Sequence, residues 1–297
     1  MPKGKIVSIG GNLDLFPEDP ILEKIIDEIK EDEDHSPTLS IIPSASKKPY
    51  GSAKQYSHLF SNAGAETQTI YPENREEANE ESLLEKVRES DGFFFTGGSQ
   101  LRITALLGGT QMVEEMHKKF EEGALVSGTS AGAVCLTRTM IAYGDSEESL
   151  LHGMVELSPG LNFIEDAVID THFTVRGRFP RLIHVVTEHP GVLGVGLGED
   201  IAAVWDFEEM DFTVIGSSNI VVVDGKDIGQ SNVPNIQYRE PICVEGVQVH
   251  VLGNGWGYDL EEHKPFRIED FDITHPNQEV LAKKDHQDPD DIPNQRR

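Results

Sequence analysis

Cysteine, basic residues and long hydrophobic runs are all scarce in this chain of 297 residues. Its two cysteines, Cys135 and Cys243, stand far apart and outside any zinc-binding spacing, so we expect two reduced core thiols and no metal site. No stretch is long and apolar enough for a signal peptide or a membrane-spanning helix. These absences predict a cytoplasmic protein that does not bind membranes.

Basic residues are outnumbered two to one, because 25 Lys and Arg stand against 52 Asp and Glu and leave a net charge of -27. Contacts to phosphate need clustered Lys and Arg, so we exclude nucleic acid as a partner. The charge indicates an acidic surface, and an adaptation to salt or a cationic substrate would produce the same composition.

Short apolar runs alternate with segments of helical period through the first two thirds of the chain. The runs cover residues 6–9, 39–42, 67–71, 92–96, 124–127 and 167–170, and the helical segments cover 20–30, 52–63, 74–90, 101–107, 110–121 and 178–188. This alternation predicts an α/β fold with a doubly wound, mainly parallel sheet flanked by helices.

A β-rich texture begins at about residue 200, where short runs at 201–205, 212–215, 219–223 and 247–252 are separated by turns. We expect these runs to continue one domain that spans residues 1–275, since one core can still serve a chain of this length. Residues 276–297 are polar and predict a flexible tail.

The sequence ALVSGTSAGAVCL at 124–136 places a G-x-S-x-G motif between a strand-like run and small residues suited to a helix. A nucleophile elbow needs this context, because a sharp strand-to-helix turn tolerates only small neighbours. The alternative is a tight glycine-rich connection with a capping serine. We predict that Ser130 is the nucleophile of a serine hydrolase.

A serine hydroxyl needs a base to take its proton, and a histidine oriented by a carboxylate is the usual arrangement. Of the eleven histidines, His172 follows the run at 167–170 and should lie at the edge of the sheet where Ser130 lies. For the carboxylate we favour Glu199, which ends another apolar run, with Asp200 and Asp170 as alternatives. The order Ser, His, acid differs from that of α/β-hydrolases.

Oxyanion stabilisation needs backbone donors that converge on one point. Gly97 and Gly98 follow the run FFFT at 93–96 and can lie close to a ligand. The amides of Gly98 and Ala131 are therefore the candidates for the oxyanion hole, and an ordinary β-turn is the alternative for the two glycines.

Four stretches together resemble cyanophycinase and its relatives, a family of serine peptidases with a glutamine-amidotransferase-like fold. They are FFFTGGSQLRI at 93–103, SGTSAGAVCL at 127–136, DTHFTVRGRFPRL at 170–182 and GVGLGEDIAAVW at 194–205. The resemblance implies Ser130 as nucleophile, His172 as base, Glu199 as third member, and a homodimer. It also implies a substrate pocket with Gln100, Asp170, Thr171, Arg176, Arg178 and Arg181.

The resemblance implies a serine exopeptidase that cuts the aspartyl backbone of cyanophycin, a poly-aspartate that carries arginine on each β-carboxyl, without a metal or an organic cofactor. The arginines would pair with substrate carboxylates, while Asp170 or another acid would receive the guanidinium. Ser99 and Thr171 depart from the acidic residue and the glutamine common in the family. An aspartyl or isoaspartyl dipeptidase and a catalytically silent binding protein are the alternatives.

Overall fold

A computed structural model describes residues 2–12, 19–30 and 36–268. Its main sheet has nine strands, in the order β17-β16-β11-β10-β1-β5-β4-β2-β3. Their bounds are β1 Ile6–Ile9, β2 Thr38–Ile42, β3 Glu66–Thr69, β4 Gly92–Phe95, β5 Leu125–Thr129, β10 Ile201–Asp206, β11 Asp211–Gly216, β16 Trp256–Asp259 and β17 Lys264–Arg267. The helices are α1 Pro20–Ile29, α2 Pro49–Asn62, α3 Glu81–Arg88, α4 Gln100–Leu107, α5 Gln111–Glu122, α6 Ala131–Val134 and α7 Phe179–Glu188.

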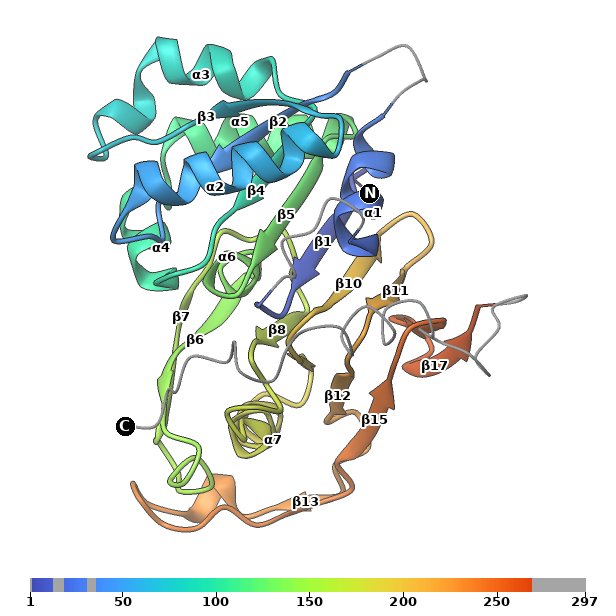
Figure 1. Cartoon of the computed structure of the whole chain (residues 1–297). Helices are drawn as coiled ribbons and strands as arrows, with labels where there is room; N and C mark the ends of the chain where they lie inside the picture. Colours follow the sequence, from blue (N-terminus) through green and yellow to red (C-terminus); the bar gives the residue numbers. More distant parts are fainter. Residues whose placement is uncertain (1, 13–18, 31–35, 269–297) are drawn as a thin grey trace, which may run out of the picture.

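Five strands, from β3 to β1, are parallel and have helices on both faces (Figure 1). Successive side chains of a strand point to opposite faces, and β4 shows how this builds two cores. Phe93 and Phe95 pack with α3, α4 and α5, whereas Phe94 packs with α1 and α2. This half of the sheet confirms the predicted doubly wound α/β architecture.

The other side of β1 differs from a parallel sheet, because β10 pairs with it antiparallel and β11, β16 and β17 continue in the same way. The strand-rich end of the chain therefore extends the main sheet. The run at 167–170 was expected in the parallel sheet, and that expectation is wrong. It forms β8 of a second sheet, where it pairs in parallel with β9, and the position beside β1 is taken by β10.

The second sheet has the order β15-β12-β9-β8, with β8 and β9 parallel and the other pairs antiparallel. Its strands are β8 Ala167–Asp170, β9 Leu193–Leu197, β12 Ile220–Asp224 and β15 Gln248–Leu252. Helix α7 packs on one face through Leu182, Val185 and Val186. The opposite face joins the main core through Val195, Leu197 and Val222.

Two hairpins lie outside both sheets and were not expected from the sequence. They are β6 Thr139–Gly144 with β7 Val155–Pro159, and β13 Gln230–Ser231 with β14 Val244–Glu245. The second belongs to an arm at the bottom of Figure 1, which also holds the short 3₁₀ turn η2 Val233–Asn235. The arm reaches the β6–β7 loop through a bridge between Leu151 and Pro241.

Three local expectations need correction or cannot be tested. The helix expected at 74–90 is divided, because Glu80 is extended between the 3₁₀ turn η1 Glu77–Asn79 and α3. Cys135 is buried as expected, and its burial raises the pKa of the thiol, but Cys243 is exposed. The predicted tail at 276–297 lies outside the described residues.

In the part of the chain that is described, no helix has the length and apolar character needed to cross a membrane.

Candidate active site

Ser130 lies on a sharp turn between β5 and α6, with φ 53° and ψ -118°. This conformation is uncommon for a residue with a side chain. The chain passes so close to β4 that a Cβ on Gly132 would lie 2.1 Å from the carbonyl oxygen of Phe95, which explains the small residues around the serine. The local geometry is that of a nucleophile elbow.

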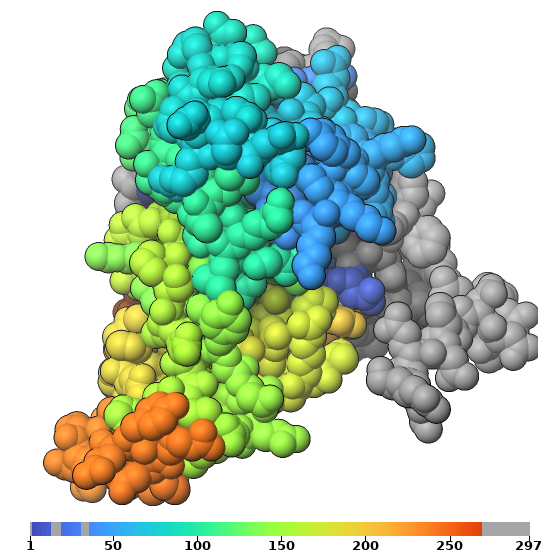
Figure 2. All heavy atoms as spheres, turned by 90° about the vertical axis from the view of Figure 1, so that its left-hand side faces the viewer, coloured from blue at the N-terminus to red at the C-terminus, as the bar shows by residue number. Residues whose placement is uncertain are grey.

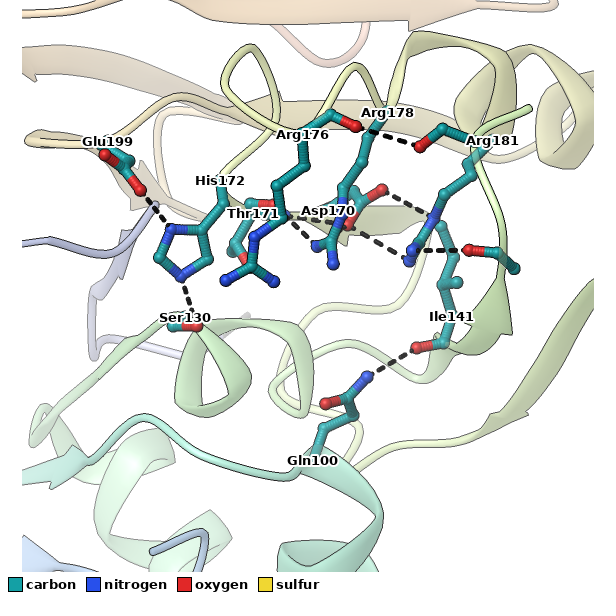
Figure 3. Close-up of polar contacts among 12 residues, drawn as sticks. Gln100, Ser130, Ile141, Asp170, Thr171, His172, Arg176, Arg178, Arg181 and Glu199 are labelled. Carbon is teal, nitrogen blue, oxygen red and sulfur yellow. Dashed lines mark hydrogen bonds and ion pairs between the residues drawn. The ribbon is translucent and has the colours of Figure 1, made fainter. Parts of the chain in front are cut away.

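A chain of two hydrogen bonds links Ser130, His172 and Glu199 (Figure 3). Ser130 Oγ lies 3.0 Å from His172 Nε2, and His172 Nδ1 lies 2.7 Å from Glu199 Oε1. The carboxylate accepts from Nδ1–H, which leaves Nε2 free to accept the serine proton. The other two candidate acids have different partners from His172. Asp200 accepts a hydrogen bond from the Ser217 hydroxyl, and Asp170 forms ion pairs with two arginines.

The last residue of β1 and the two glycines after it hold the three segments that contain Ser130, His172 and Glu199. The carbonyls of Ile9, Gly10 and Gly11 accept hydrogen bonds from the amides of Ser130, His172 and Asp200, at 2.9, 2.9 and 3.0 Å. Three consecutive carbonyls therefore set the spacing of three segments that are far apart in the sequence.

Gly11 also lies against the imidazole itself. A Cβ at this position would lie 2.4 Å from Cε1 and 2.6 Å from Nε2 of His172, and the glycine has φ 108°. The sequence analysis missed this residue, although the pair Gly10-Gly11 at the end of the first apolar run was visible. Only glycine at position 11 leaves enough room for the imidazole ring of His172 in its observed position.

The two proposed oxyanion donors lie beside the serine. Ala131 follows it directly, and a Cβ on Gly97 would lie 3.5 Å from the Cβ of Ser130, which brings the Gly97-Gly98 turn next to this serine. Among the described residues, the amides of Gly98 and Ala131 donate to no other group. Both N–H groups are therefore free to bind a substrate oxygen.

Asp170 was expected to face a substrate guanidinium, but it is 1% exposed and already paired. Its carboxylate lies 2.9 Å from Arg178 Nη1 and 3.0 Å from Arg181 Nε. Burial raises the pKa of Asp170, and the guanidinium groups of Arg181 and Arg178 oppose that shift. These three residues form an internal ion-pair network, so Asp170 is not open to a substrate cation.

The remaining predicted pocket residues divide between the cleft and the interior. Arg176 is exposed, and in Figure 3 its guanidinium points toward the space bordered by Ser130 and Gln100. Gln100 donates from Nε2 to the carbonyl of Ile141 at 3.1 Å. Thr171 is 2% exposed, which leaves its side chain almost no surface for substrate contact and corrects its place in the pocket.

The candidate site contains a serine, a histidine and a carboxylate joined by two hydrogen bonds. Within residues 2–12, 19–30 and 36–268, no three His, Cys, Asp or Glu side chains come together in a way that could hold a metal ion. The arrangement of Ser130, His172 and Glu199 is the constellation that defines serine hydrolases.

Comparison with known proteins identifies the family. The family model for peptidase family S51 matches residues 10–213. A cyanophycinase from Synechococcus elongatus is 33% identical over 228 residues, which cover 76% of this chain and 70% of that protein. A cyanophycinase from Geminocystis herdmanii is 33% identical over 229 residues, which cover 76% and 84%. The chain belongs to peptidase family S51 and is a peptidase.

A solved structure shows the same fold at low sequence identity. The crystal structure of a peptidase from an acI-B1 Actinobacterium superposes with a TM-score of 0.66 at 16% identity, and the match covers 90% of this chain and 97% of that one. The fold is therefore that of a known peptidase.

Proposed function

We propose that this peptidase cuts the aspartyl backbone of cyanophycin, or of a similar peptide built from β-Asp-Arg units, as a serine exopeptidase. The observation that carries the proposal is the continuous hydrogen-bond chain from Ser130 through His172 to Glu199, with Arg176 directed at the same space. The 33% identity to proteins named cyanophycinase supports the substrate.

The mechanism that we propose has two steps. His172 Nε2 takes the proton of Ser130 Oγ as the oxygen attacks the scissile carbonyl, and the amides of Gly98 and Ala131 bind the resulting oxyanion. His172 then donates that proton to the leaving amine, the carbonyl–nitrogen bond breaks and an acyl-enzyme remains. A water molecule, deprotonated by His172, then attacks the ester carbonyl. The bond between that carbon and Ser130 Oγ breaks, His172 returns the proton to Oγ, and the product leaves as a carboxylate.

Arg176 supports the choice of substrate. Arg178 and Arg181 are occupied by Asp170, so Arg176 is the member of the predicted arginine group whose charge is available at the cleft. A guanidinium pairs well with a carboxylate, and every β-Asp-Arg unit presents one on its arginine. We therefore assign Arg176 to a substrate carboxylate.

The test is mass spectrometry of the products formed from cyanophycin and from a panel of aspartyl and isoaspartyl dipeptides. We expect the unmodified protein to release β-Asp-Arg and the Ser130→Ala variant to release none, a loss of at least about 10⁴-fold because the variant lacks the attacking oxygen. Ser82→Ala removes an exposed hydroxyl on α3, away from the site, and should keep full activity.

Three outcomes would change the proposal. Release of β-Asp-Arg by Ser130→Ala at the unmodified rate would refute the nucleophile. Cleavage of dipeptides alone would favour the dipeptidase. If neither substrate is cleaved and a fluorophosphonate probe does not label Ser130, the chain is a binding protein.

A further inference from the structure

One segment of this acidic chain contains no acidic residue at all. Residues 36–65 hold neither Asp nor Glu, although the chain has 52 of them, and they carry Lys47, Lys48 and Lys54. The segment forms β2, the loop that follows it, and α2. We call these three lysines the lysine ledge.

The lysine ledge is not neutralised by its surroundings. All three residues are exposed, and within the described part of the chain none of them forms an ion pair. Elsewhere lysines do find carboxylates, since Lys5 pairs with Glu28 and Lys118 with Glu115. These exposed ammonium groups are therefore available to an anionic ligand, and the carboxylate of Glu73 beside them accepts a hydrogen bond from Tyr50 Oη at 3.0 Å.

The lysine ledge begins beside the catalytic centre. Ser99 donates from its amide to the carbonyl of Ala45 at 3.1 Å, and Arg102 Nε donates to the carbonyl of Ser44 at 3.1 Å. The loop that leads to Lys47 is thus fastened to the turn that carries the proposed oxyanion donor Gly98. In Figure 2 the blue surface around residue 50 faces the yellow surface around residues 170–190 across a hollow.

A hollow of about 330 Å³ adjoins the ledge and could receive a side chain of the substrate. Lys54 and Lys86 line it together with Tyr50 and Tyr71, whose rings meet edge to face at 5.7 Å. Two ammonium groups suit a carboxylate, and the exposed ring of Tyr50 suits a guanidinium. An arginine residue with a free carboxylate carries both groups.

We propose that the lysine ledge is a subsite that binds the arginine carboxylates of substrate units next to the bond that is cut. The inference rests on the proposed function for its choice of substrate. The polymer would pass from Ser130 over the Gly97-Gly98 turn to the ledge, so that units beyond the cleaved one contribute to binding. The acidic remainder of the surface would not compete for these carboxylates.

The test measures binding separately from cleavage, by fluorescence anisotropy in the full chain with Ser130→Ala. The probe is a labelled trimer of β-Asp-Arg, and its matched control is the same trimer with arginine carboxamides in place of the carboxylates. The variant replaces Lys47, Lys48 and Lys54 by Gln. A control variant replaces Lys3, Lys30 and Lys226, three exposed lysines outside the ledge, so that both variants lose the same charge.

We expect the ledge variant to raise the Kd of the carboxylate trimer about tenfold, with no loss for the carboxamide trimer and less than a twofold change in the control variant. The subsite is overturned if the Kd rises equally in the two variants or equally for the two probes. It is also overturned if the carboxylate trimer does not bind the protein with all three ledge lysines in place. Thermal unfolding of both variants checks that the fold is kept.

The outcome for the proposed function is read separately, with the unmodified chain and cyanophycin. Ledge-dependent binding without release of β-Asp-Arg would sink the peptidase proposal and leave the subsite standing. Release of β-Asp-Arg together with binding that does not depend on the ledge would support the peptidase proposal and overturn the subsite.

Discussion

Ser130 has a backbone conformation that costs a residue with a side chain about 1–3 kcal/mol. The strain is held by long-range contacts, because its amide donates to Ile9 and the chain beyond it packs against β4 through Gly132. His172 also has positive φ and is held in turn by the carbonyl of Gly10. At the scale of single residues, Ile9, Gly10 and Gly11 are therefore as much a part of the site as the three hydrogen-bonded side chains.

Gly11→Ala should impair catalysis without unfolding the protein. The new methyl group would overlap the His172 ring and move Nε2 away from Ser130, and a misplacement of this kind costs about 10²-fold in kcat. We expect a small change in KM. The rate of fluorophosphonate labelling of Ser130, measured across pH, reports the displaced base directly.

Gly64→Ala is the matched control for this prediction. Gly64 also has a left-handed backbone, with φ 101°, but a Cβ there would meet nothing within 4 Å. Both variants should lose about 1 kcal/mol of unfolding free energy from backbone strain, and only Gly11→Ala should lose activity. Equal activity in the two variants would contradict the role assigned to Gly11.

At the scale of elements, the second sheet brings His172 to Ser130, and buried contacts join that sheet to the main one. Asp224 at the end of β12 is 3% exposed and accepts from Tyr258 Oη of β16 at 2.9 Å and from His263 Nδ1 at 2.7 Å. Burial alone would raise the pKa of Asp224, but hydrogen bonds from the Lys226 amide, His263 and Tyr258 outweigh it and lower the pKa. The ionised carboxylate thus links the two sheets.

Asp224→Asn should lower the free energy of unfolding by about 2 kcal/mol at neutral pH, because it weakens hydrogen bonds to a buried charge. A lowered carboxyl pKa contributes stability that is present above the pKa of the unfolded state and is lost as pH falls through the folded pKa. The difference between the two proteins should therefore shrink in acid. Urea unfolding at several pH values measures it.

Asp166→Asn provides the control at this scale, since Asp166 is an exposed carboxylate just before β8. It should change the unfolding free energy by less than about 0.5 kcal/mol. If the two variants Asp224→Asn and Asp166→Asn have equal free energies of unfolding at neutral pH, the proposed link between the sheets is ruled out.

At the scale of the whole molecule, the net charge of -27 acts against the compact state. Ion pairs such as those of Lys5 with Glu28 and Asp206 offset part of the repulsion, but acidic residues outnumber basic ones by 27. Arg176 and the three lysines of the ledge are exposed basic groups within this excess of carboxylates, whereas Arg178 and Arg181 are paired with Asp170.

Salt should stabilise this protein. Raising sodium chloride from about 0.01 M to about 0.5 M shortens the screening length several-fold and weakens repulsion between carboxylates, so we expect Tm to rise by several degrees. Differential scanning calorimetry measures the change, and an uncharged osmolyte at equal osmolarity controls for effects other than screening. A Tm that is independent of salt would show that the acidic surface carries no net repulsion.

The sequence by itself determined the parallel half of the sheet and the elbow at Ser130, because both follow from local patterns. Apolar runs alternate with helical segments there, and only small residues fit the turn at 128–132. The positions of His172 and Glu199 after apolar runs were also visible in the sequence. In the structure, His172 hydrogen-bonds to both Ser130 and Glu199.

Three features were decided only by the tertiary structure. His172 follows a strand of the second sheet, Asp170 forms ion pairs with Arg178 and Arg181, and Gly11 lies against the imidazole of His172. Each of these depends on contacts between segments far apart in the chain, such as β1 with β10 and Gly10 with His172. A local pattern reports which side chains can be buried, and the partner that each one meets is set by how the sheets pack.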